Sequence, residues 1–127
     1  MQALLLVGAG GALGAMARYW VGTLVGHAYR GPFPYATFMV NILGSLIMGL
    51  VVGYLARFTP AGQGWLRLFI AVGILGGFTT FSSFSLEAAL LIERGNLGLS
   101  FVYVLSSVVA GVIALFIGLF VMRGGAA

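Results

Sequence analysis

Long apolar stretches with very few charged residues are the feature that most restricts how this chain can fold. Hydrophobic residues make up 61% of its 127 residues and charged residues only 6%, which is too little charge for a solvated globular surface. The stretches fall at residues 3–25, 36–56, 66–92 and 99–122. Each is long enough for a membrane span, since a helix crosses the apolar core with about 20 residues. The sequence therefore predicts an all-α membrane protein, a single domain of residues 1–127 with four transmembrane helices.

The few charged side chains exclude several classes of function. Six basic and two acidic residues give a net charge of +4 and are spread singly, whereas nucleic-acid binding needs a basic patch, so we expect no nucleic-acid partner. The absence of cysteine removes disulfides, thiolate metal sites and thiol catalysis. One histidine and two acidic residues are poor material for an enzyme. The start of the chain, MQAL, lacks the cationic region of a secretory signal, so we interpret the first stretch as a retained helix.

The third apolar stretch is interrupted near its middle by residues 76–85, with the sequence GGFTTFSSFS. Gly76 and Gly77 offer a point where the helix can unwind, and Thr79 and Thr80 can hydrogen-bond to carbonyls freed there. Polar groups inside a bilayer need a protein or water partner, so these hydroxyls indicate a buried polar site and not lipid contact. We expect a third helix that is broken near its middle.

Isolated polar side chains also fall within or beside the other predicted spans. Arg18 is either an anchor at the membrane interface or part of a water-filled vestibule. Asn41 needs partners, and taken alone its simplest interpretation is a hydrogen bond between helices. Glu87 either reaches toward the interface or faces a cavity. His27 is expected in the loop that joins the first two helices, and Pro60 and Gly62 mark a turn before the third.

Phe81 and Phe84 lie three residues apart and share one helix face if this segment is helical. Such pairs usually pack helices together, but here they alternate with the hydroxyls of Ser82 and Ser85. Because phenyl rings have an electropositive edge, a dry row of ring edges and hydroxyls can coordinate a small anion. Backbone carbonyls at a helix break favour the opposite task, the coordination of a monovalent cation. The residues by themselves indicate a small membrane pore or carrier, with an anion preferred and Glu87 as the only candidate carboxylate at depth.

The arginines leave the orientation of the chain in the membrane almost undecided. Arg57, Arg67 and Arg123 fall on one side, and Arg30 and Arg94 fall on the other. Because positive charge near the spans sets orientation, a margin of one arginine allows insertion both ways. An antiparallel pair of such chains would have the inverted symmetry that many transporters obtain from internal repeats.

Residues 76–87, GGFTTFSSFSLE, resemble the third-helix signature of the Fluc (CrcB) family of bacterial fluoride channels. Arg18, Val40 with Asn41, Gly44, the ERG turn at residues 93–95 and the four-span length also fall where that family has them. The resemblance implies a passive fluoride-selective channel that exports cytoplasmic fluoride across the bacterial inner membrane. It also implies a dual-topology antiparallel homodimer in the lipid bilayer, with two pathways lined by both subunits.

The resemblance assigns roles to individual residues. Phe81 and Phe84 look like the ring-edge ligands of fluoride, and Asn41 looks like the pore asparagine. A structural sodium ion at the dimer interface is implied, held by the backbone carbonyls of Gly76 and Thr79. The remaining pathway residues are implied to be the hydroxyl donors Thr80, Ser82 and Ser83, the vestibule arginine Arg18, the glutamate Glu87, and Tyr103 and Ser107 on the fourth helix.

The fourth helix departs from the family pattern at one position. Tyr103, Ser107 and Gly111 are spaced four apart and lie along one helix face. Tyr103 and Ser107 resemble the start of a polar track, but the third position is a glycine and has no hydroxyl. Either the track is shorter in this chain, or a water fills the gap left by the missing hydroxyl.

Two other classes of function compete with a fluoride channel. The first is a dual-topology drug exporter of similar size, which depends on a glutamate in its first helix, where this chain has no acidic residue. The second is an accessory subunit that transports nothing, which the polar interior of the third helix disfavours. Fluoride efflux measured on the purified protein separates the three.

Overall fold

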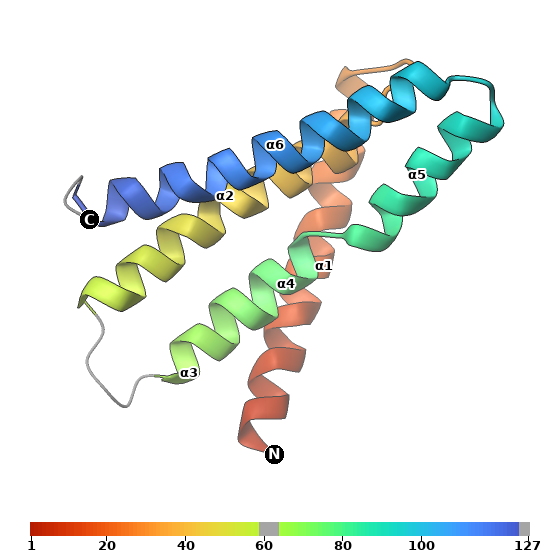
Figure 1. Cartoon of the computed structure of the whole chain (residues 1–127). Coiled ribbons are helices and arrows are strands. Elements are labelled where there is room, and N and C mark those ends of the chain that lie inside the picture. Colours follow the sequence, from red (N-terminus) through yellow and green to blue (C-terminus); the bar gives the residue numbers. More distant parts are fainter. Residues whose placement is uncertain (59–63, 125–127) are drawn as a thin grey trace.

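The computed structural model describes residues 1–58 and 64–124, and every regular element within these residues is a helix (Figure 1). Within these described residues, four helical segments are long and apolar enough to cross a membrane, which confirms the predicted four spans. The third segment, Gly64–Glu93, is built from several pieces. The elements are α1 (Gln2–Ala28), α2 (Tyr35–Phe58), α3 (Gly64–Leu66), the π-helix η1 (Arg67–Leu75), α4 (Gly76–Phe78), α5 (Phe81–Glu93) and α6 (Leu97–Met122).

The helix ends agree with the predicted spans to within a few residues, with one error of placement. His27 lies in the last turn of α1 and not in the following loop, so its expected position is wrong. The helix continues to Ala28 because the residues that stop it come later, at Gly31 with its positive φ of 132° and at two prolines. The predicted turn at Pro60 and Gly62 lies outside the described residues.

The third span is broken as predicted, but not at the glycines. Gly76 and Gly77 are helical in α4, and the backbone becomes extended only at Thr79 (φ −84°, ψ 158°) and Thr80 (φ −148°, ψ 120°). The hydroxyl of Thr79 donates to the carbonyl of Leu75 over 3.1 Å and ends one helix. The hydroxyl of Thr80 accepts from the backbone N–H of Ser83 over 3.2 Å and begins the next as an N-cap. Threonine side chains, and not glycine flexibility, therefore set the break.

Glycines serve instead to bring α1 against η1 and α4. A Cβ built on Gly77 would lie 2.5 Å from the carbonyl oxygen of Gly11, and one built on Gly73 would lie 3.0 Å from the Cα of Gly10. Gly14 is pressed in the same way against the backbone of Ile74. Gly10, Gly11 and Gly14 form a small-residue face on α1, which fixes α4 and the break at a constant distance from α1.

A second set of glycines brings α2 against α6, and these two helices lie side by side along most of their length (Figure 1). Gly49 faces the backbone of Leu115, and Gly53 faces Met122 further along, so the two helices run in the same direction. A Cβ on Gly118 would lie 2.5 Å from the carbonyl oxygen of Leu46. The end of the pair is tied by Arg57, whose Nη1 donates to the carbonyl of Met122 over 3.1 Å.

The second half of the third span, α5, packs mainly on the start of α6. A short turn joins them, in which Gly95 takes a positive φ of 83°. Ser100 is buried and its hydroxyl donates to the carbonyl of Ala88 over 2.9 Å, and Leu91 of α5 is also buried. The outer face of α6 carries exposed apolar side chains such as Phe116 and Phe120, as expected of a surface that meets lipid or another membrane helix.

We expect Gly118→Ala to destabilise the α2–α6 pair by about 1–3 kcal/mol, because the added Cβ would meet only backbone atoms that cannot move aside. The measurement is thermal unfolding of the purified protein in detergent, followed by circular dichroism. Gly98→Ala on the same helix is the matched control, since a Cβ there meets no atom within 4 Å. Equal melting of the two variants would contradict the close approach of these helices.

Candidate functional site

The broken third span is held open by the side-chain amide of Asn41 on α2. Its Nδ2 donates to the carbonyl of Thr80 over 3.0 Å, and its Oδ1 accepts from the N–H of Thr80 over 2.8 Å. The amide thus pairs with the extended backbone as a neighbouring strand would. An amide nitrogen carries two hydrogens, so one donor of Asn41 remains for another partner.

These side chains change the backbone hydrogen bonding around the break. In a continuous α-helix the N–H of Thr80 would donate to the carbonyl of Gly76, but here it donates to Asn41. Likewise the N–H of Ser83, which would reach the carbonyl of Thr79, donates to the hydroxyl of Thr80. The carbonyls of Gly76 and Thr79, two predicted cation ligands, are therefore deprived of their usual helical donors.

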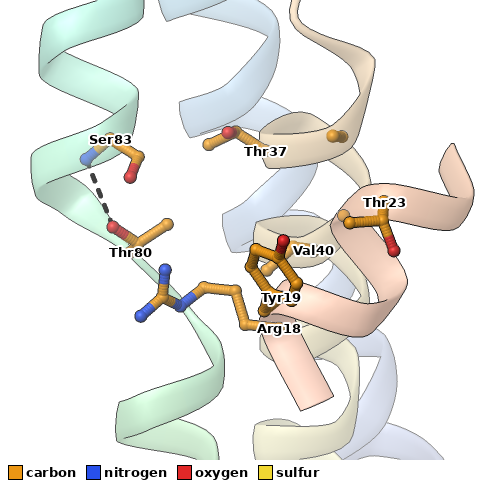
Figure 2. Close-up of a pocket in the computed structure, with 9 residues that line it drawn as sticks. Arg18, Tyr19, Thr23, Thr37, Val40, Thr80 and Ser83 are labelled. Carbon is orange, nitrogen blue, oxygen red and sulfur yellow. Dashed lines mark hydrogen bonds between the residues drawn. The ribbon is translucent and has the colours of Figure 1, made fainter. Parts of the chain in front are cut away.

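Arg18 on α1 reaches the same break and lines a hollow of about 270 Å³ between α1, α2 and α5. Its Nε donates to the carbonyl of Gly77 over 3.1 Å, which holds the side chain across the helix end. Figure 2 shows the guanidinium directed toward Thr80, with Ser83 and Thr37 also around the hollow. The described residues that line it include one arginine and no carboxylate. This hollow suits an anion by charge and by its hydroxyl donors.

A second hollow, of about 330 Å³, lies on another side of Thr80. It is bordered by Asn41 and Ser45 from α2, and by Thr79, Thr80 and Phe81 from the third span. Thr80 therefore borders both hollows, and Asn41 fixes its position between them. The break and its clamp form the wall that these two spaces share.

A row of aromatic rings extends from the break along α5 to α6. The centroids of Phe81 and Phe84 are 5.8 Å apart, and those of Phe84 and Tyr103 are 5.1 Å apart. Phe33, from the segment before α2, extends the row with its ring nearly perpendicular to that of Tyr103 at 5.4 Å. The structure thus brings together the predicted residues Phe81, Phe84 and Tyr103, and adds Phe33, which sequence reasoning missed.

Tyr103 connects this row to Glu87. The tyrosine is completely buried, and its hydroxyl donates to Oε1 of Glu87 over 3.3 Å. Glu87 also lines a third hollow, of about 300 Å³, together with Phe33 and Arg94. Of the two alternatives for this carboxylate, a position that faces a cavity is the one that the structure supports.

The hydroxyls at the remaining predicted positions lie in different settings. Ser82 is exposed and lies 3.4 Å from the hydroxyl of Thr80, oxygen to oxygen. The hydroxyl of Ser107 on α6 is buried and has no hydrogen-bond partner among the described residues. A buried hydroxyl without a protein partner usually has a water or ion as its partner.

Sequence reasoning also missed Thr37 and Ser45, which line the first and second hollows. Their signal is visible in retrospect, because Thr37, Asn41 and Ser45 are spaced four apart and share one face of α2. Among the described residues there is no cluster of three or more His, Cys, Asp or Glu that could hold a metal. Backbone carbonyls are the oxygen ligands that the break itself provides.

Fold and site together define a small helical membrane protein whose interior is built for an anion, around a helix interrupted at mid-span. Residues 5–119 match the family model described as CrcB-like protein, Camphor Resistance (CrcB), and the chain belongs to this family. It is 52% identical over 127 residues to the fluoride-specific ion channel FluC of Novosphingobium aromaticivorans, covering 98% of each chain. It is 56% identical to FluC of Phenylobacterium zucineum, covering 97% of each, and 50% identical to FluC 2 of Nitrobacter hamburgensis, covering 94% of this chain and 95% of the relative. The resemblance inferred from residues 76–87 is confirmed.

We expect Asn41→Ala to lower the free energy of unfolding by about 1–3 kcal/mol, because it leaves the N–H and carbonyl of Thr80 without partners. Unfolding in detergent, followed by circular dichroism, measures the change. Asn96→Ala is the matched control, since that side chain makes no capping hydrogen bond. A variant at position 41 as stable as the one at position 96 would show that the clamp contributes nothing.

Proposed function

We propose that this chain is a fluoride-selective passive ion channel of the bacterial inner membrane. Four membrane spans and family membership support this function, together with relatives about half identical over nearly the whole chain and named as fluoride-specific channels. Hydrogen fluoride enters cells as a neutral weak acid and dissociates inside, so a passive path for the anion relieves its accumulation. The structural observation that carries the proposal is the row of aromatic rings that begins beside the break and its hydroxyls.

The anion is attracted into the hollow beside Arg18 and then transferred to neutral donors. Arg18 supplies a guanidinium to that hollow, and the Thr80 and Ser83 side chains border it. Beyond Thr80, the second amide hydrogen of Asn41 and the edge of Phe81 offer weak, closely spaced contacts. Weak contacts at several sites favour conduction over tight binding, because an ion must be able to leave each site. Fluoride, the smallest halide, fits such short contacts best.

A second subunit in the antiparallel orientation completes each pathway. Phe81 is 78% exposed in the single chain, and the hydroxyls of Ser82 and Ser85 are exposed beside it in the middle of a span. Exposing hydroxyls to lipid tails at this depth costs free energy, so we infer that a second protein surface covers them. The nearly balanced arginines allow the two chains to insert in opposite directions.

The same interface holds a sodium ion through the carbonyls of Gly76 and Thr79. Both carbonyls have lost their helical donors to Asn41 and Thr80, and Gly76 is exposed on the single chain. Hard oxygen ligands without competing donors suit a monovalent cation. When bound there, a cation would supply positive charge that balances the partial negative charge of the Gly76 and Thr79 carbonyl oxygens.

The alternative of a drug exporter is not supported. The named relatives are channels, and α1 has no acidic residue to bind a cationic drug. An accessory subunit would not need the arginine and hydroxyl-lined hollow at the break.

We expect liposomes that contain this protein to release fluoride much faster than chloride, because the larger anion cannot make short contacts to ring edges and hydroxyls. Valinomycin is added to carry potassium ions across the membrane, so that no membrane potential opposes anion efflux. A fluoride electrode and a chloride electrode then measure the two effluxes. Protein-free liposomes are the control. Comparable efflux of both anions would exclude a fluoride-selective channel.

We expect the double variant Phe81→Ile, Phe84→Ile to keep its fold and lose most of its fluoride conductance, since isoleucine fills the space without an electropositive edge. The same electrode assay measures the loss, and gel filtration checks the assembly. Phe116→Ile and Phe120→Ile, on the exposed face of α6, form the matched control pair. If the Phe81 and Phe84 variant conducts as well as the control, the rings are packing residues only.

A further inference from the structure

The hydroxyl that α6 lacks at Gly111 has a counterpart on α2. The Cβ of a side chain at position 111 would lie 3.6 Å from the hydroxyl of Ser45 and 3.8 Å from Cδ1 of Ile42. Both are ordinary van der Waals distances, so the position is small but not crowded. The hydroxyl oxygen of Ser45 therefore lies in van der Waals contact with the position that the Cβ of a serine at 111 would occupy.

The hydroxyls of Tyr103 and Ser107 lie along the same face of α6 as Gly111, and this series ends at Ser107. Ser107 lies one turn before Gly111, and four helical residues rise about 6 Å. The hydroxyl of Ser107 is buried without a protein partner among the described residues, which indicates that a water or ion contacts it. A further donor is needed about one turn along for such an ion to continue past Ser107.

Ser45 also belongs to the hollow at the helix break. It borders that hollow together with Asn41, Thr79, Thr80 and Phe81. On α2 it lies one turn after Asn41, on the same face. Its hydroxyl is thus adjacent to both the α6 track and the space beside the ring of Phe81.

We propose that Ser45 is a residue of the fluoride pathway, and that its hydroxyl replaces the one missing at Gly111. The inference rests on the proposed channel function. Ser45 donates to the anion between Ser107 and the hollow bordered by Asn41 and Phe81, so the polar track crosses from α6 to α2 instead of continuing along α6. A small residue at position 111 leaves the space through which this crossing occurs.

The test measures fluoride efflux from liposomes for the wild type, Ser45→Ala, and the double variant Ser45→Ala, Gly111→Ser. We expect Ser45→Ala to slow efflux about three- to tenfold, the effect of one lost hydrogen bond to the passing ion. The double variant should recover most of the wild-type rate, because its hydroxyl returns to the same space from the opposite helix. Ser106→Ala is the control, since that hydroxyl donates to the carbonyl of Tyr103 within its own helix.

Each outcome decides the proposal. Unchanged efflux in Ser45→Ala overturns it, and so does a slowed variant that Gly111→Ser fails to restore. Wild-type protein that releases no fluoride would instead refute the channel function itself. If Ser45→Ala does not give a normal gel-filtration peak, Ser45→Thr and Ser45→Val carry the test, because they share a shape and differ in the hydroxyl. Faster efflux in the threonine variant then supports the role of Ser45, and equal efflux overturns it.

Discussion

A backbone hydrogen bond that is lost inside a membrane has to be replaced from within the protein, and this requirement governs the third span. The break at Thr79 and Thr80 removes helical bonds where no bulk water is available. Side chains from α1, α2 and the break itself replace them: Asn41 pairs with the backbone of Thr80, the Thr80 hydroxyl caps α5, and Arg18 donates to the carbonyl of Gly77. The interruption is therefore a defined structure and not a flexible point, and its polar groups are held at fixed positions.

Close approaches at glycines of α1 and α2 make these replacements possible. Gly11 and Gly14 bring α1 close enough to α4 for Arg18 to reach the end of that helix. On the other side, Gly44 is buried against Thr79 and Phe78, so that Asn41, one turn earlier on α2, lies level with Thr80. Backbone-to-backbone packing thus sets the distances over which the polar side chains act. The packing of the apolar helices therefore positions the few polar side chains.

Much of this architecture follows from the sequence because the bilayer imposes strict conditions. Four spans, a broken third span, and aligned rings at Phe81 and Phe84 were all predictable from apolar length and spacing. The position of the break was not, since glycine flexibility suggested Gly76 and Gly77 while the hydroxyls decided for Thr79 and Thr80. The end of α1 was also misplaced at His27, because helices in membranes continue until a residue stops them.

The sequence by itself determined the class of protein, the four spans, the polar character of residues 76–85 and the family. These depend on composition and local spacing, which each segment carries alone. Only the tertiary structure decided which partner each polar group has, because residues distant in the chain meet through helix packing. The amide of Asn41 on Thr80, Tyr103 on Glu87, and Ser45 beside Gly111 are such meetings. The proposed pathway depends on them.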